Sequence, residues 1–288
     1  MIPAEFGYAR PKSLDDALKL LAKADGSTKI IAGGQSLLPL MKLRLARPGQ
    51  LIDIGRLAEL KGVRSLPDGR VAVGAMTTYA ELLDSAVNAY GLMRDALPRI
   101  GDVQVRNRGT IGGAIAHADP ASDLPACLLA LDVELVARST AGERTIPIKA
   151  FFEDAFQTGL HPDEILTEIR LPGPRDDAGS AYVSLEQPAS GYALVGVAVV
   201  VARSAPGKAI TLARVALTGV GPVAYRAAGV EKALTGSDGS AKALAEAASH
   251  AADGVAVNSD IHADRTYRTE MAKVFTQRAL EAALARIE

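Results

Sequence analysis

Two glycine pairs, each beside a hydroxyl-bearing residue, are the segments of this 288-residue chain whose residue types best suit ligand binding. The first segment consists of Ala32, Gly33, Gly34, Gln35, Ser36 and Leu37, and the second of Thr110, Ile111, Gly112, Gly113 and Ala114. A glycine pair lets the backbone turn tightly and approach a ligand, and a concave run of N–H groups binds phosphate oxygens. Two such segments can hold the two phosphates of a dinucleotide. Each segment alone is equally consistent with a structural turn.

A third segment with chemical potential follows the second glycine pair along the chain. It runs from His117 through Ala118-Asp119-Pro120-Ala121-Ser122 to Asp123, and it leads into an apolar run that predicts a helix over 124–131. The carboxylate of Asp123 suits two roles. It can cap the N-terminus of that helix, or it can accept hydrogen bonds from ribose hydroxyls, as acids do in other dinucleotide sites. The residues leave both roles open.

One further segment, Gly219-Val220-Gly221-Pro222-Val223-Ala224, formally matches the G-x-G-x-x-A nucleotide-binding pattern. No second βαβ half follows it, and the position about 20 residues later falls in an Ala-rich predicted helix without a convincing acid. We therefore interpret this segment as the start of a helix with Pro222 in its first turn. Neither glycine pair matches that pattern or a P-loop.

Residues typical of metal and nucleophilic chemistry are sparse. The four histidines, which lack the spacing of a metal site, are His117, His161, His250 and His262. Cys127 lies in an apolar run and is predicted to be a small buried side chain. No Ser-His-Asp or Cys-His nucleophile is evident, so we predict neither a catalytic residue nor a metal site in this chain.

Composition and charge narrow the class of protein. Hydrophobic residues make up 48% and charged residues 23%, which is ordinary for a globular protein and excludes an intrinsically disordered chain. The 32 basic and 33 acidic residues give a net charge of -1, without the basic excess typical of nucleic-acid binding. A single cysteine excludes an internal disulfide and four-cysteine clusters. Because the chain has no apolar run of about 18 residues and no signal pattern, we predict a cytoplasmic protein without a transmembrane segment.

Periodicity and turn residues predict the elements that position these segments. Ser13 is expected to cap a helix from Leu14, in an α/β region that ends near residue 56 and contains strands at 29–32 and 51–54. From 57 to 177 we expect a capped helix from Thr78, an irregular stretch over 106–123, and strands at 62–66, 70–74, 133–137, 144–148 and 165–171. Pro172-Gly173-Pro174 marks a domain boundary. Beyond it we expect strands at 193–202 and 210–217 and helices at 223–235, 239–252 and 264–286.

Taken together, the glycine segments and Ala118–Asp123 resemble the signatures of a known family, the FAD-binding medium subunits of molybdenum hydroxylases, which include carbon monoxide dehydrogenase and xanthine dehydrogenase. The resemblance covers nearly the whole chain and implies an α+β fold. A para-cresol-methylhydroxylase-type FAD-binding domain would span 1–177, in two α/β subdomains at about 1–56 and 57–177. A C-terminal domain with a small antiparallel sheet and helices would span 178–288.

The resemblance also implies roles for individual residues. In this family the two glycine segments hold the FAD pyrophosphate, and the position of Asp123 contacts the adenosine part. Ile100 and Leu166 stand where backbone or apolar contacts to FAD are made, and Tyr192 matches an aromatic residue that covers the flavin ring. The chain departs from the family pattern at Gln35, at Ala114 and at 184–187. We expect FAD binding to survive these departures, because the phosphate contacts are mainly made by backbone.

The activity that the resemblance implies is that of an oxidoreductase subunit within a complex. A large subunit with the molybdenum cofactor oxidises the substrate, and a small subunit with two 2Fe–2S clusters relays electrons to the FAD of this chain, which passes them to an external acceptor. Two such heterotrimers form a dimer. The alternatives are a stand-alone flavoprotein oxidoreductase of the same fold and a non-enzymatic assembly protein. A stand-alone oxidase needs a substrate-covering domain, for which the ~110 residues after Gly173 are few.

Overall fold

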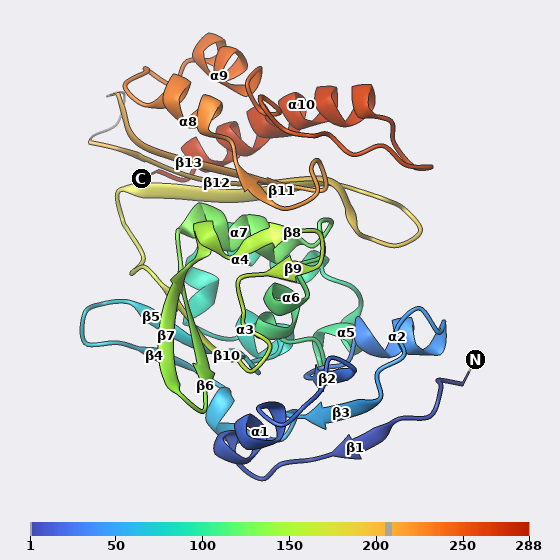
Figure 1. Ribbon diagram of the computed structural model, residues 1–288. Helices are drawn as coiled ribbons and strands as arrows, with labels where there is room; N and C mark the ends of the chain where they lie inside the picture. Colours follow the sequence, from blue (N-terminus) through green and yellow to red (C-terminus); the bar gives the residue numbers. More distant parts are fainter. Residues whose placement is uncertain (1, 205–208, 288) are drawn as a thin grey trace.

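Three β-sheets and a short ribbon organise the computed structural model of the chain, which describes residues 2–204 and 209–287 (Figure 1). A three-stranded sheet lies within residues 7–53, a five-stranded sheet within 63–171 and a four-stranded sheet within 178–226. The ribbon pairs β8 (Phe152–Asp154) with β9 (Gln157–Thr158). In Figure 1 the N-terminal sheet lies at the bottom of the view and the C-terminal sheet lies near the top, with the middle region between them.

The N-terminal sheet is parallel, with β3 (Gln50–Asp53) paired to both β1 (Gly7–Ala9) and β2 (Thr28–Ile31). Helix α1 (Leu14–Leu21) joins β1 to β2, and Ser13 caps it as predicted, its Oγ accepting from the Asp16 N–H at 3.1 Å. After β2 the chain passes through residues 32–36 into α2 (Leu37–Lys42). The first glycine segment therefore begins at the carboxyl end of a parallel strand, where open α/β sheets commonly bind ligands.

The second sheet is antiparallel, in the order β4-β5-β10-β6-β7. Its strands confirm the five predicted ones and are β4 (Val63–Ser65), β5 (Val71–Gly74), β6 (Glu134–Ser139), β7 (Gly142–Pro147) and β10 (Ile165–Leu171). The helices and 3-10 turns of this region are η1 (Ala58–Leu60), α3 (Tyr79–Leu83), η2 (Ala86–Ala89), α4 (Gly91–Ala96), η3 (Leu97–Arg99), α5 (Val103–Arg106), α6 (Ile111–His117), α7 (Asp123–Leu131) and η4 (Ile148–Ala150). Thr78 and Glu81 form the predicted capping box at the start of α3.

The prediction of an irregular stretch over 106–123 is wrong, because α6 occupies residues 111–117. Thr110 caps this helix: its Oγ1 accepts from the Gly113 N–H at 3.2 Å. Glycine lowers helix propensity, yet here packing requires it. A Cβ on Gly112 would lie 2.7 Å from the carbonyl oxygen of Ala75, so no larger residue fits between α6 and the end of β5.

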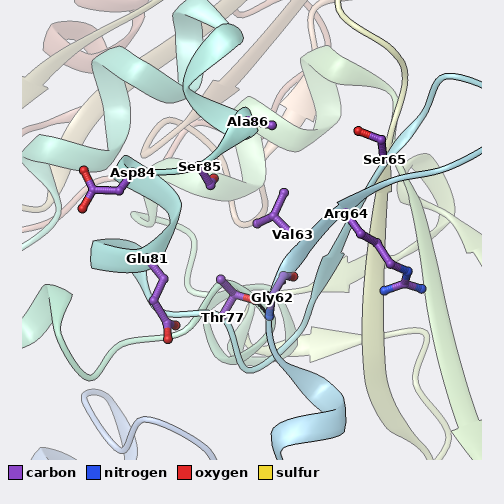
Figure 2. A pocket seen from close by; sticks show the side chains of 9 residues that line it. All are labelled: Gly62, Val63, Arg64, Ser65, Thr77, Glu81, Asp84, Ser85 and Ala86. Atoms are coloured by element: carbon purple, nitrogen blue, oxygen red, sulfur yellow. Dashed lines mark hydrogen bonds between the residues drawn. The ribbon is translucent and has the colours of Figure 1, made fainter.

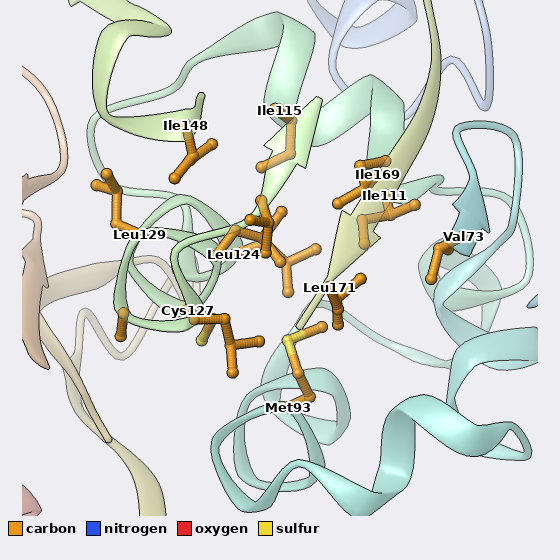
Figure 3. Packing of buried hydrophobic residues seen from close by; sticks show 14 of the residues in the cluster. Val73, Met93, Ile111, Ile115, Leu124, Cys127, Leu129, Ile148, Ile169 and Leu171 are labelled. Atoms are coloured by element: carbon orange, nitrogen blue, oxygen red, sulfur yellow. The ribbon is translucent and has the colours of Figure 1, made fainter. Parts of the chain in front are cut away.

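The main hydrophobic core forms where α6 and α7 pack against the second sheet (Figure 3). Every residue of α7 is buried, and Cys127 among them confirms its prediction as a small buried side chain. Ile111 and Ile115 of α6 belong to the same cluster as Ile169 and Leu171 of β10. This packing fixes the first turns of α6 and α7, and with them the residues of the second and third candidate segments.

The C-terminal sheet is antiparallel and follows the sequence order β11 (Ala178–Glu186), β12 (Ala193–Arg203), β13 (Ile210–Thr218) and β14 (Tyr225–Arg226). Strands β12 and β13 were predicted, whereas β11 and β14 were not. Helices α8 (Ala228–Leu234), α9 (Ala241–Ala248) and α10 (Arg265–Leu284) cover one face of this sheet, and α4 and α7 pack on the other (Figure 1). The predicted helix start at 223 is wrong, because the chain first reverses at Gly219, where φ is +80°, and forms β14.

Candidate functional site

The first glycine segment leaves β2 with its backbone N–H groups unengaged. Among the residues that the structure describes, no acceptor is found for the N–H groups of residues 33–37. Gly34 has φ +76°, a left-handed conformation that side chains other than glycine rarely adopt. Ser36 precedes α2 without making a side-chain cap hydrogen bond, so its hydroxyl is also available. Gln35 is exposed, and its Nε2 donates to the Gly33 carbonyl at 3.3 Å.

The two glycine segments lie against each other. A Cβ on Gly33 would overlap the carbonyl group of Arg108 and would lie 3.0 Å from the Cα of Gly109. A Cβ on Gly113 would lie 3.6 Å from the Cβ of Ala32. Glycine at these positions therefore lets two chain segments about 80 residues apart come into backbone contact. The open N–H groups of the first segment lie beside the second segment.

The second segment offers a ligand different hydrogen-bond donors from those of the first segment. The N–H of Ile111 donates to the Thr77 carbonyl at 3.1 Å, and that of Gly112 donates to the Ala75 carbonyl at 2.8 Å. Thr110 is 3% exposed, and its Oγ1 already accepts from the Gly113 N–H. Because a hydroxyl can donate while it accepts, the Thr110 O–H remains a donor toward a ligand. This segment is the first turn of a helix with most of its N–H groups engaged.

Asp123 does not cap α7, so the capping alternative is wrong. Ser122 occupies the N-cap position, and the hydroxyl of Tyr182 in β11 donates to the Asp123 Oδ1. Burial raises the pKa of Asp123 from its ordinary value of 3.8 to about 6, while the hydrogen bond from Tyr182 acts in the opposite direction. A nearly buried carboxyl with a raised pKa is typical of functional sites.

The segment that contains Asp123 is anchored by the C-terminal sheet. The Pro120 carbonyl accepts from the Gly219 N–H at 2.7 Å and from the Thr218 Oγ1 at 2.8 Å. Thr218 Oγ1 also lies 2.8 Å from the Ser122 carbonyl, and the Ala193 N–H donates to the Ala121 carbonyl at 3.4 Å. Gly219, part of the segment that formally matches a nucleotide-binding pattern, thus serves the contact between the second region and the C-terminal sheet.

Tyr192 stands immediately before β12 and is 45% exposed. Burial raises the pKa of its hydroxyl above the ordinary value of 10.0, and the charges of Asp119 and Asp123 add to the effect. Tyr192 lines a cleft of about 290 Å³ that Asp119, Pro120 and Phe156 share with residues of the C-terminal region. The ring therefore faces the same end of the molecule as the third candidate segment.

Ile100 and Leu166 lie at the main core. Leu166 in β10 is 5% exposed and belongs to the core cluster, and the half-buried Ile100 packs against that cluster after η3. The Ile100 carbonyl accepts from the Arg106 Nη1 at 3.2 Å. Both side chains therefore contribute apolar surface to the main core.

A separate groove of about 380 Å³ lies between β4 and the α3–η2 segment (Figure 2). None of the predicted site residues lines it. Glu81 is engaged in the capping box, and the Thr77 Oγ1 accepts from the Gly62 N–H at 2.9 Å. The polar groups of this groove are thus largely used within the protein, and the groove does not extend the candidate site.

Within residues 2–204 and 209–287, no group of three or more His, Cys, Asp or Glu residues is placed to hold a metal ion. No helix in that described part is long and apolar enough to cross a membrane.

Unengaged N–H groups at the end of a parallel strand, an apposed helix start and a buried acid are groups that suit the binding of a nucleotide. Comparison with known protein families identifies the nucleotide as FAD. Residues 4–174 match the family described as "FAD binding domain in molybdopterin dehydrogenase", and residues 180–283 match "CO dehydrogenase flavoprotein C-terminal domain". The chain belongs to the family of FAD-binding medium subunits of molybdenum hydroxylases.

Similar proteins span the whole chain. The carbon monoxide dehydrogenase medium chain of Hydrogenophaga pseudoflava is 40% identical, over 99% of both chains. The glyceraldehyde dehydrogenase medium chain of Sulfolobus acidocaldarius is 38% identical, over 98% of this chain and 99% of that one. A solved structure of the Hydrogenophaga pseudoflava carbon monoxide dehydrogenase matches with a TM-score of 0.95 at 41% identity, over 99% of both chains. These matches confirm the predicted family and the α+β fold class.

The residues that join the third segment to the C-terminal sheet were not predicted from the sequence. Tyr182 and Thr218 provide the side-chain donors, and they stand 59 and about 96 residues from their acceptors. Strand β11 was not predicted, so nothing placed Tyr182 opposite Asp123. The available signal was a lone tyrosine among small residues, Ala178-Gly179-Ser180-Ala181-Tyr182, which is compatible with a strand that faces helices closely.

Proposed function

We propose that the chain is the FAD-carrying electron-transfer subunit of a molybdenum-containing hydroxylase complex, taking electrons from an iron–sulfur subunit and passing them to an external acceptor. The observation that carries the proposal is the row of N–H groups over residues 33–37, which have no acceptor in the described structure and lie against the second glycine segment. Such a row suits phosphate oxygens. The membership of the chain in a family of FAD-binding domains supports the identity of the ligand.

The residues present fit the pyrophosphate of FAD. In this proposal the first segment, from Ala32 to Leu37, binds phosphate oxygens through its N–H groups and the Ser36 hydroxyl. The second segment, from Thr110 to Ala114, contributes chiefly the Thr110 hydroxyl, because the N–H groups of Ile111 and Gly112 are engaged. Binding by backbone groups explains why a glutamine at position 35 is compatible with FAD.

Four further residues complete the proposed site. Asp123 accepts a hydrogen bond from the adenosine part, Ile100 and Leu166 make backbone or apolar contacts, and Tyr192 covers the flavin ring. When bound, FAD supplies the electron-carrying chemistry. The residues of the chain bind and orient the cofactor and shield it from water on the Tyr192 side. We propose no catalytic acid or base in this subunit.

The partners follow from the same proposal. Relatives are named as medium chains or as subunits of dehydrogenase complexes, which supports assembly with other chains. We propose a large subunit with the molybdenum cofactor and a small subunit with 2Fe–2S clusters, in a dimer of heterotrimers located in the cytoplasm. We further propose a division of this chain into an FAD-binding domain over 1–177, with subdomains of about 1–56 and 57–177, and a C-terminal domain over 178–288.

Release of the cofactor tests the proposal directly. Heat treatment of the purified full-length chain, followed by chromatography, should yield FAD, and recovery of FMN alone or of no flavin would contradict it. A pull-down from the native host should bring two further subunits with molybdenum and iron. If the chain instead oxidised an organic substrate alone, with no partner, the stand-alone oxidoreductase would be correct.

A further inference from the structure

We propose that Tyr182, in the first strand of the C-terminal sheet, is a positioning residue for the FAD site. Its buried hydroxyl holds Oδ1 of Asp123, so that the carboxylate stays ionised and presents Oδ2 to FAD. The inference rests on the proposed function, because it assigns Asp123 to FAD. It adds that a residue outside the FAD-binding domain sets the charge of that acid.

Tyr182 is held by hydrogen bonds from both its side chain and its backbone. It is 2% exposed, and its hydroxyl donates to the Asp123 Oδ1 at the start of α7. Its backbone N–H donates to the Asp95 Oδ2 of α4 at 3.0 Å, and Asp95 in turn binds the Arg286 Nη1 at 2.6 Å. The tyrosine is therefore held by two helices of the second region, and its hydroxyl has a defined position relative to Asp123.

The neighbouring strand leaves room for this hydroxyl. Gly196 in β12 lies against it, and a Cβ at Gly196 would overlap the Tyr182 oxygen. On the other side, the Asp123 Oδ1 is occupied, and no hydrogen bond to Oδ2 is found among the described residues. The carboxylate therefore has one oxygen bound within the protein and one that can accept from a ligand hydroxyl.

The electrostatic surroundings make this hydrogen bond important. Burial raises the pKa of Asp123 to about 6, and Tyr182 opposes that rise. Of the other charged groups, Glu186 of β11 raises the pKa of Asp123 and Arg99 of η3 lowers it. The remaining titratable neighbours, which burial keeps protonated and neutral by raising their pKa values, are Tyr79, Cys127 and Tyr192. Removing the Tyr182 hydroxyl should therefore let Asp123 take up a proton closer to neutral pH.

The test compares Tyr182→Phe with the parent in the full-length chain. FAD dissociation constants are measured by quenching of flavin fluorescence between about pH 5 and 9. Parent affinity should fall as the pH falls through the region near 6, and the variant should show the same fall about one to two pH units higher. At pH 7 the variant should bind FAD several-fold to about tenfold more weakly, and at pH 9 the two should agree. Asp123→Asn should give a flat profile over this range.

A matched control separates charge from structure. Tyr225→Phe removes a partly buried hydroxyl that donates to the Ala251 carbonyl within the C-terminal region, and it should leave the profile unchanged. If Tyr182→Phe folds poorly, 3-fluorotyrosine at position 182 provides a donor of greater acidity with nearly the same shape and should move the profile to lower pH. An equal loss of affinity at every pH, or an unchanged profile, would overturn the proposal. A parent chain that binds no FAD at any pH would instead overturn the proposed function itself.

Discussion

Replacing Asp123 with asparagine should stabilise the FAD-free chain near neutral pH and weaken FAD binding at the same time. The side chain is 8% exposed, and burial raises its pKa from 3.8 to about 6 against the hydrogen bond from Tyr182. Asparagine has nearly the same size, and its Oδ1 can accept the same hydrogen bond. The substitution therefore chiefly removes a buried negative charge.

The sign and size of the change in unfolding free energy caused by Asp123→Asn follow from proton binding by the Asp123 carboxyl. In the unfolded chain the Asp123 carboxyl titrates near 3.8, whereas the folded chain holds the proton up to about pH 6. Between these values the folded state binds more protons, so the free energy of unfolding falls as the pH rises through this window and stays reduced above it. A difference of about two pH units corresponds to about 3 kcal/mol. Asp123→Asn should gain about this stability above pH 6 and almost none below about pH 4.

Urea unfolding of the FAD-free parent and the Asp123→Asn variant, followed by circular dichroism, measures the difference in their stability at about pH 4 and at about pH 7.5. The control is Asp119→Asn on the same segment, where the half-buried carboxylate accepts from the Ala121 N–H at 2.9 Å. This control should not gain stability at neutral pH. A variant at position 123 that is less stable than the parent at pH 7.5, or that differs equally at both pH values, would refute the argument that a buried charge is retained there for binding.

Four further substitutions test other parts of the site and the contacts that support it. Gly34→Ala places an alanine in the left-handed conformation, at a cost of about 1–2 kcal/mol, and should lower the FAD content with a small loss of thermal stability. Gly112→Ala should lower the melting temperature much more, because its Cβ would clash with the backbone of Ala75. Tyr192→Ala should keep FAD bound yet alter its absorbance and its reoxidation by oxygen in stopped flow, and identical spectra and rates would make Tyr192 purely structural. Asp95→Asn should cost about 1.5–3 kcal/mol in urea unfolding by weakening its bond to Arg286, which follows α10, and an unchanged midpoint would show that this bond contributes little.

The local signals in the sequence were sufficient for elements that depend on neighbouring residues. Ser13 and Thr78 cap their helices as predicted, because a cap involves residues only three positions apart. The run into Gly33 and Gly34 predicted a strand followed by an N–H-rich turn, and β2 and the open N–H groups agree with it. These features need no knowledge of the tertiary structure.

The features that were missed depend on contacts between distant residues. Helix α6 was not predicted because Gly112 and Gly113 lower its propensity, and only the close approach of Ala75 explains why glycine stands there. Strand β11 has small and polar residues on faces that are covered by helices, so its alternation is weak. The bond from Tyr182 to Asp123 joins residues 59 positions apart, and no local pattern reports it.

The candidate site offers backbone groups in its first segment and side chains in its third. Over residues 33–37 the available donors are chiefly N–H groups, with the Ser36 hydroxyl in addition, so we expect binding there to depend on conformation and to tolerate a change such as Gln35. In the third segment the carbonyls of Pro120, Ala121 and Ser122 are already bound by the C-terminal sheet. A ligand that reaches this segment therefore meets side chains, above all Asp123, and substitutions there change affinity through charge. The same sheet supplies the hydroxyl that holds Asp123. We therefore expect the C-terminal region to influence cofactor affinity through Asp123 rather than through the glycine segments.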